Sequence, residues 1–283
     1  MMMTEGQRLR TRISDGLRRG FDASWKASAF LQVFGTLAFF FPFSLFFVAG
    51  GFLPPQLNWM SSVILILGGI ATFFSELRST SIPVAILRLA AVALVLFVVE
   101  YVGVTTGYPF GAYVYTHELG LLVAGVPVAI AVAWYCTVIN TWRIAEGLTG
   151  GSKRGNRIAV ALLAGVLTLG LDIALEPMAG FIEGYWVWES GVVPVQNYAS
   201  WFLLSTAAVY LLSGRIGYKD PHPDPAGFWV AVALFGFHFL LFVFTILVHG
   251  YLLPAAIALA LVSFPFALRG RSMRLLLPEV ARR

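Results

Sequence analysis

The sequence predicts an all-α, polytopic bundle of about eight transmembrane helices with both termini in the cytoplasm. Apolar residues make up 59% of the chain and charged residues 12%, values outside the range of a water-soluble domain. Apolar runs of about 20 residues, enough to cross the hydrocarbon layer as a helix, recur along the chain. All 19 Lys and Arg residues can be placed on one side of a membrane. Together these observations predict an integral membrane protein.

Eight apolar runs are expected to span the membrane. They are Ala27–Leu53, Trp59–Phe74, Pro83–Val102, Leu119–Ile139, Ile158–Leu175, Tyr198–Leu212, Phe228–Val248 and Tyr251–Leu268. The second and the sixth are short, so they are either spans with misplaced ends or partly re-entrant segments. The alternating polar pattern of a membrane barrel is absent, and unpaired backbone is not tolerated in lipid, so helices are expected.

The basic residues give the expected orientation. With the N-terminus inside, they cluster before the first run, at every second connection and after the eighth run. The positive-inside rule then places both termini in the cytoplasm and favours a plasma membrane. Because these residues are scattered over short loops, nucleic acid is not an expected partner, whereas membrane lipid is.

Residues 27–268 are expected to form one transmembrane domain between a basic N-terminal segment (1–26) and a basic tail (269–283). In the N-terminal segment a large apolar residue recurs every fourth position among arginines, at Leu9, Ile13, Leu17, Phe21 and Trp25. This pattern fits an amphipathic helix on an anionic leaflet or, equally, a disordered tail that fixes topology. No apolar core is followed by a cleavage pattern, so no signal peptide is expected.

The expected outer side carries acids and no basic side chain. Its acids are Glu100, Glu118, Asp172, Glu176, Glu183 and Glu189. Asp172 and Glu176 lie four residues apart, so on a helix they share one face, and Pro177 is expected to end that helix or start a turn. Two carboxylates this close repel, so one is expected to carry a proton and act as a general acid beside a base. The alternative is that both lie in headgroup water or cap helices.

The outer loops around these acids are rich in aromatic residues. One loop holds Tyr101, Tyr108, Phe110, Tyr113 and Tyr115, and the other holds Phe181, Tyr185, Trp186 and Trp188. These rings either wall a tunnel for a long apolar ligand and face a developing cation, or form an ordinary interfacial belt. Glycines and prolines in both loops favour a defined, turn-rich cap.

Other candidate sites are weaker. His117 beside Glu118 is a possible metal ligand, but no His-x-x-His or His-Glu-x-x-His spacing occurs, so no metal is expected. His238 and His249 are expected to be hydrogen-bonded packing residues, although either could relay a proton. No Rossmann fingerprint, Walker loop or haem motif is present, so no nucleotide or redox cofactor is expected.

Several motifs together resemble the CruF-type carotenoid biosynthesis proteins. They are residues 107–115 (GYPFGAYVY), Leu171-Asp172 with Glu176-Pro177, Trp186-Val187-Trp188, and Pro194 with Asn197 and Trp201. The resemblance covers the region from about the third span to the sixth. The resemblance implies that this protein is a cofactor-independent carotenoid 1,2-hydratase of the membrane. The family includes bisanhydrobacterioruberin hydratases and γ-carotene 1'-hydratases. Such enzymes add water across the terminal C1–C2 double bond of an acyclic ψ end group, giving a tertiary alcohol.

The resemblance also implies roles for residues. Asp172 and Glu176 are the expected acid and base, in an order left open because coupled carboxyls titrate together. The expected water or proton relay residues are Glu118, His117, Asn197 and Glu100. The expected substrate contacts are Tyr108, Phe110, Tyr113, Tyr115, Tyr185, Trp186, Trp188 and Trp201. A proton-coupled transporter or a lipid or pigment carrier is the alternative, but the chain has no repeated halves. The oligomeric state is not predicted.

Overall fold

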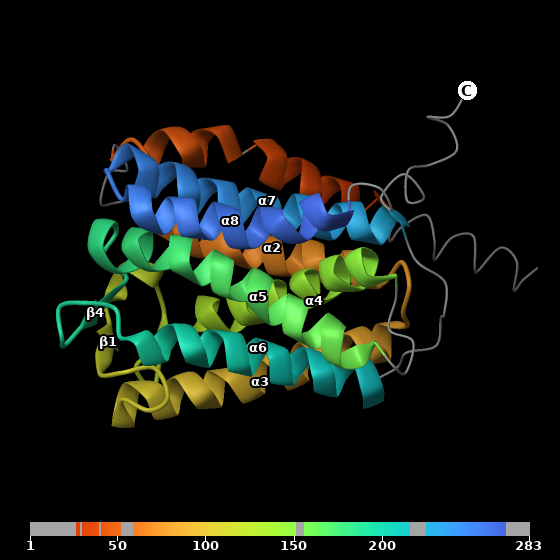
Figure 1. Cartoon of the computed structure of the whole chain (residues 1–283), viewed down its shortest axis with the longest axis horizontal. Helices are drawn as coiled ribbons and strands as arrows, with labels where there is room; N and C mark the ends of the chain where they lie inside the picture. The colour runs from red at the N-terminus through yellow and green to blue at the C-terminus, as the bar shows by residue number, and fades with distance from the viewer. Residues whose placement is uncertain are drawn as a thin grey trace, which may run out of the picture.

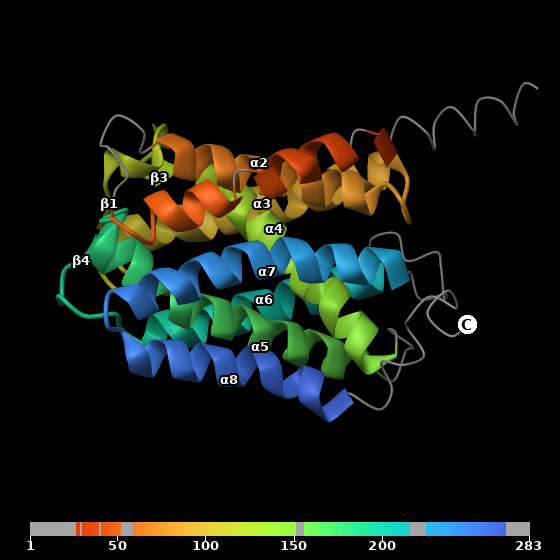
Figure 2. The ribbon, with the colours of Figure 1, turned by 90° about the horizontal axis from the view of Figure 1, so that it is seen from above.

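The protein is a bundle of long helices closed at one end by short strands, as Figures 1 and 2 show from two directions. The computed structural model describes residues 27–28, 30–39, 41–51, 59–150, 156–215 and 225–269. The expected N-terminal segment (1–26) and residues 270–283 of the expected tail lie outside the described residues.

Seven helices of the bundle carry labels in Figure 1, and helical residues at 30–39 and 41–47 precede them. They are α2 (Trp59–Glu76), α3 (Ile82–Thr106), α4 (Val128–Thr149), α5 (Arg157–Glu176), α6 (Val195–Arg215), α7 (Pro225–Val248) and α8 (Leu252–Arg269). Within the described part of the chain, six helices are long and apolar enough to cross a membrane, and α8 is apolar but shorter in its hydrophobic part. The expected all-α membrane bundle is therefore confirmed. The number of spans and the cytoplasmic side of the termini stay predictions.

The expected fourth span is wrong in its bounds. Residues 119–127 do not join the helix, because they end the 3₁₀ turn η2 (His117–Leu119) and form a hairpin of β2 (Leu122–Val123) and β3 (Val126–Pro127). Ala124 and Gly125 both have positive φ (50° and 83°), as a two-residue turn of this kind needs. The hairpin is almost entirely apolar, so by composition alone it resembles part of a span. Helix α4 instead begins at Val128 and continues ten residues beyond the expected end, to Thr149.

Helix α5 packs closely against α6 and α8 because small residues line its surface. A Cβ added at Gly165 would lie 2.9 Å from the backbone oxygen of Phe202 on α6. One added at Gly170 would lie 2.8 Å from Cγ2 of Val262 on α8. Helices α4 and α5 also pack against each other, and the two are the most buried of the candidate spans. They form the centre of the bundle and position the outer end of α5.

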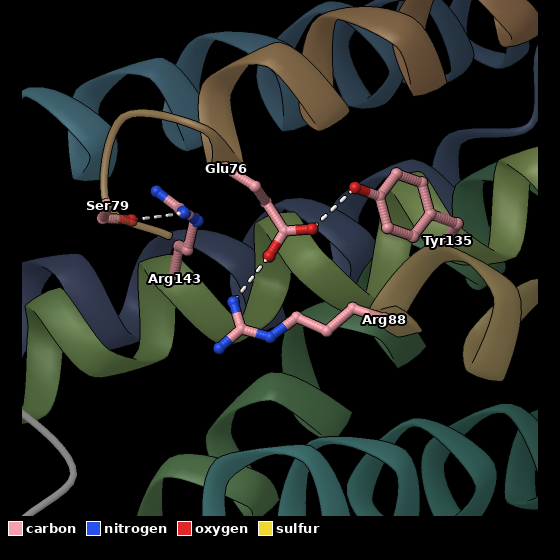
Figure 3. Close-up of polar contacts among 5 residues, drawn as sticks. All are labelled: Glu76, Ser79, Arg88, Tyr135 and Arg143. Carbon is pink, nitrogen blue, oxygen red and sulfur yellow. Dashed lines mark hydrogen bonds and ion pairs between the residues drawn. The ribbon is translucent and has the colours of Figure 1, made fainter. Parts of the chain in front are cut away.

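A buried ion pair joins α2 to α3, and a hydrogen bond to the same carboxylate adds α4, as Figure 3 shows. Nη1 of Arg88 lies 2.7 Å from Oε1 of Glu76, and the hydroxyl of Tyr135 donates to Oε2 of Glu76 at 2.6 Å. The guanidinium of Arg88 also lies over the ring of Trp142, 4.9 Å from its centroid. Both charged groups are buried away from water, so each supplies the opposite charge that stabilises the other. Trp142 is buried as well.

Candidate active site

Two strands form a roof over the end of the bundle, visible at one end of Figure 1. β1 (Tyr113–Tyr115) pairs antiparallel with β4 (Trp186–Trp188), so that Tyr113 faces Trp188 and Tyr115 faces Trp186. Side chains alternate along a strand, and the middle residues Val114 and Val187 are 51% and 53% exposed. Four aromatic residues therefore point the other way, into the protein: Tyr113, Tyr115, Trp186 and Trp188.

Glu100 lies on α3 beneath this roof and is buried. The hydroxyls of Tyr113 and Tyr115 donate to its Oε2 at 2.6 and 2.9 Å. The indole Nε1 of Trp134, on α4, donates to its Oε1 at 2.7 Å. Three donors from the roof and from α4 thus hold one carboxyl group in place.

Glu176 is the second carboxyl group under the roof. The indoles of Trp186 and Trp188 donate to its Oε2 at 3.2 and 3.0 Å. The amide nitrogen of Asn197, on α6, donates to Oε1 of Glu176 at 2.8 Å and lies 3.2 Å from Oδ2 of Asp172. One amide group therefore bridges the two carboxyl groups, and all three residues are buried. Oδ1 of Asp172 has no hydrogen-bond partner among the described residues.

The roof also fixes the two carboxyl groups relative to each other. Its tyrosines hold Glu100 and its tryptophans hold Glu176, and the rings of Tyr113 and Trp188 lie 5.0 Å apart between them. Because β1 and β4 are paired in one register, moving either carboxyl group would require the roof to distort.

The α-helix α5 ends at Glu176, directly before Pro177, as expected, but the chain does not leave the helical path there. The backbone stays helical there (φ −63°, ψ −37°) and continues as a π-helix, η3 (Pro177–Ile182). Its wider turn is closed by the bond from N of Glu183 to O of Met178, at 2.9 Å. Proline tolerates the first turn of a new helical segment, and π-turns are frequent at functional sites. The segment leads from Glu176 directly into the roof.

A partly open cavity runs from the roof into the bundle. Glu100 and Glu176 both line it, whereas Asp172 does not and is fully buried behind them. The wall is mostly apolar and aromatic, and the stacked rings of Trp134 and Trp201, 4.1 Å apart, form part of it. Its shape and lining suit a long apolar ligand with one polar or reactive end.

The roof tyrosines keep their protons. Burial, followed by the negative charge of Glu100, raises the pKa of Tyr113 and Tyr115 above the ordinary value for a tyrosine. Both hydroxyls therefore act as donors to Glu100 throughout the physiological pH range.

Comparison with known proteins identifies this architecture. A family described as "carotenoid biosynthesis protein" matches residues 60–265, which include every helix from α2 to α7 and most of α8. The chain belongs to the carotenoid biosynthesis protein family. The expected resemblance to its CruF-type members is thereby confirmed.

One curated relative of this carotenoid biosynthesis protein is the bisanhydrobacterioruberin hydratase of Haloarcula japonica. The two are 37% identical over 130 residues, which make up 44% of this chain and 43% of the relative. The match therefore spans less than half of the relative's length. No solved structure matches the chain.

Most of the expected site residues of the carotenoid biosynthesis protein lie together. Those that line the cavity are Glu100, Glu176, Asn197, Phe110, Tyr113, Tyr115, Tyr185, Trp186, Trp188 and Trp201. Asp172 joins them through Asn197. Tyr185 lines the cavity but also donates from its hydroxyl to Oγ of Ser61, at 2.6 Å.

Three expected site residues lie elsewhere. Tyr108 is 74% exposed and does not line the cavity, so it is not placed to contact a ligand there. His117 and Glu118 lie in the short turn η2, which follows the roof strand, and neither lines the cavity, although Leu119 of the same turn does. The described residues contain no group of three or more His, Cys, Asp and Glu side chains placed to hold a metal ion.

Sequence reasoning missed Trp134, the donor to Glu100 on α4. Trp134 lies in the middle of an apolar run, where its indole resembles any other core ring. The only available signal was Glu100, an acid with no cation near it in the sequence. A buried carboxyl group requires donors, and Trp is one of the few largely apolar residues that supply an N–H.

Proposed function

We propose that this carotenoid biosynthesis protein is a carotenoid hydratase that adds water across the terminal C1–C2 double bond of an acyclic ψ end group. The observation that supports it most directly is the bridged pair of buried carboxyl groups, Asp172 and Glu176, beside a cavity walled by aromatic rings. The name of the Haloarcula japonica relative supports the same class of reaction.

The proposed reaction needs only proton transfer and water. One carboxyl group gives its proton to C2, and C1 becomes a tertiary carbocation. Water attacks C1 through its oxygen, and the coupled pair of carboxyl groups accepts the proton that the water loses. A proton then passes between the two carboxyl groups and restores the starting state. No electrons are exchanged, so no redox cofactor is required.

The two carboxyl groups of the pair are not equivalent in position. Glu176 lines the cavity, so we assign it the contact with the reacting carbons or with water. Asp172 is buried behind it on the shared amide of Asn197, so we assign it the exchange of the proton with Glu176. Since the two groups act as one coupled unit, the order of acid and base stays open.

Glu100 faces the same cavity from α3, so it is placed to hold the attacking water. The aromatic wall supports the cationic intermediate, because the faces of aromatic rings attract positive charge. Trp134, Trp186 and Trp188 supply such rings close to the carboxyl groups, and their N–H groups already point at Glu100 and Glu176. The apolar remainder of the cavity would take the polyene chain.

The test is expression in cells that accumulate lycopene or γ-carotene, followed by mass spectrometry of the pigments. The wild-type protein should give a pigment heavier by one water, and Asp172→Asn and Glu176→Gln should give none. Glu189→Gln, an exposed acid of the same loop as β4, is the matched control and should retain full conversion. Unchanged pigment with a folded wild-type protein would contradict the proposal and favour a carrier. Conversion by both site variants would contradict the assignment of the pair.

A further inference from the structure

A second polar cluster lies at the inner end of the same cavity. Cys136, Asn140 and His238 line it there, and Thr72 of α2 packs against the first two. Asn140 lies six residues beyond Trp134 on α4, which places it about 9 Å further from the roof at the rise of a helix. Within the described part of the chain, neither Glu100 nor Glu176 is hydrogen-bonded to a residue of this cluster, so the cluster is separate from the carboxyl groups under the roof.

The hydrogen bonds of Thr72 fix the orientation of the Asn140 amide. The Thr72 hydroxyl donates its proton to the backbone oxygen of Gly68 at 2.8 Å. It can then only accept from Asn140, so the amide presents Nδ2 to it, at 2.9 Å. Oδ1 of Asn140 is left on the other side, buried and without a partner among the described residues.

His238 is fixed in the same way. Its Nδ1 lies 3.0 Å from the backbone oxygen of Leu234, and a carbonyl oxygen can only accept, so Nδ1 carries the proton. In the neutral ring, Nε2 is then an acceptor, and this atom too is buried without a partner in the described part of the chain.

The position of the imidazole depends on Gly68. A Cβ at that position would lie 2.9 Å from Cε1 and 3.2 Å from Nε2 of His238. The absence of a side chain on α2 therefore leaves room for the ring at the cavity wall. Asn140 and His238 thus both line the cavity, and each keeps one buried acceptor, Oδ1 or Nε2, for which the described residues supply no donor.

We propose that the inner end of the cavity is a binding site for an O–H group, which donates its proton to Nε2 of His238; a water, which has a second proton, also donates to Oδ1 of Asn140. Unpaired buried acceptors are unfavourable, and an O–H group is the smallest donor that satisfies them without bringing charge into the bundle. The group is either a bound water or a hydroxyl carried by the pigment. The proposal rests on the proposed function only for the choice of a carotenoid as ligand.

The experiment compares two probes, lycopene and lycopene hydrated at one end, with purified protein in detergent. Quenching of the tryptophans that line the cavity gives a Kd for each probe without turnover, so the test stands even if hydration itself fails. The variant is His238→Phe. The control is His249→Phe, because Nδ1 of His249 makes the same type of bond, to the oxygen of Thr245 at 2.9 Å, but His249 does not line the cavity.

If the pigment supplies the O–H group, His238→Phe should weaken binding of the hydroxylated probe about tenfold and leave lycopene unaffected, as expected for one lost hydrogen bond. If water supplies it, both Kd values should hold while hydration of lycopene slows about tenfold. His249→Phe should change none of these quantities. No change with His238→Phe, or an equal loss for both probes, would overturn the proposal.

Asn140→Leu removes the other acceptor. If a water donates to both atoms, this variant too should slow hydration about tenfold, and both Kd values should hold. Near-ultraviolet circular dichroism and thermal unfolding show whether each variant folds. Should His238→Phe fail to fold, His238→Leu removes the same acceptor and decides the question by the same two Kd values and the same rate.

Discussion

The amide of Asn197 donates to Oε1 of Glu176 at 2.8 Å, and the same nitrogen reaches Oδ2 of Asp172 at 3.2 Å. Asn197 lies on α6 and the two acids lie on α5, so this contact crosses between the helices that pack most closely in the bundle. A neutral donor between two carboxyl groups reduces their repulsion without neutralising either one. The bridge therefore holds the pair together while leaving it able to exchange a proton.

Asn197→Leu should slow hydration by roughly ten- to a hundredfold, because a hydrogen bond to a charged group contributes about 1.5–3 kcal/mol. Initial rates of pigment conversion in isolated membranes measure the effect. Gln196→Leu is the matched control, since Gln196 is an exposed neighbouring amide that donates to the oxygen of Gly107. An unchanged rate for Asn197→Leu would show that the bridge is not needed for turnover.

Glu100→Gln should leave the bundle folded and slow hydration by about a hundredfold or more, of the size seen when a positioned proton-transfer group is lost. The amide keeps an acceptor for the indole of Trp134 but removes the charge that accepts from the roof tyrosines. Rate and Kd for lycopene should be measured together. A loss of binding with an unchanged rate at saturation would assign Glu100 to pigment binding instead of water.

Arg88→Met should destabilise the protein by about 3–5 kcal/mol, because it leaves Glu76 charged and buried without its partner. The double variant Glu76→Leu with Arg88→Met should recover most of that loss, since the removal of both charges is often neutral. Unfolding in mixed micelles measures both. Arg143→Met removes a cation that makes an exposed hydrogen bond to the hydroxyl of Ser79 at 2.9 Å, as drawn in Figure 3, and it should cost less than about 1 kcal/mol.

Glu183, which lies outside the membrane-spanning helices, should make the free energy of unfolding depend on pH. Burial raises its pKa, an effect that the nearby His249 opposes and Glu118 reinforces. A carboxyl group whose folded pKa is raised supports folding below its unfolded pKa, about 4.3, and loses that support as pH rises through the folded pKa. Wild type should therefore lose stability relative to Glu183→Gln as the pH rises from about 4.3 through the raised folded pKa. If the free energy of unfolding changed equally with pH in wild type and Glu183→Gln, the prediction would be wrong.

Some of the site could be predicted because its residues are close in sequence or fall in recognisable motifs. Asp172 and Glu176 share a helical face at a spacing of four, and Trp186 and Trp188 alternate as a strand requires. The two acids could be singled out as candidate catalytic residues because acids without nearby cations are rare in apolar sequence. The helical bundle could be predicted because its helices are continuous apolar runs, which hydropathy detects directly.

The remaining features depend on contacts that no local pattern encodes. Trp134 reaches Glu100 across 34 residues, and the pairing of Tyr113 with Trp188 joins two loops 75 positions apart. The apolar β2–β3 hairpin was mistaken for a span because hydropathy does not distinguish a turn with positive φ from a helix. That Asp172 lies behind the cavity wall, and Glu176 in it, depends on the rotation of α5 about its axis.

The roof has a consequence for how the protein is made. One of its strands precedes α4 and the other follows α5, so β1 has no pairing partner until two further helices have been synthesised. A nascent chain that ends before residue 186 lacks both indoles that hold Glu176, and it has no roof. Synthesis must therefore continue through β4, well past the middle of the chain, before the carboxyl groups have all their donors.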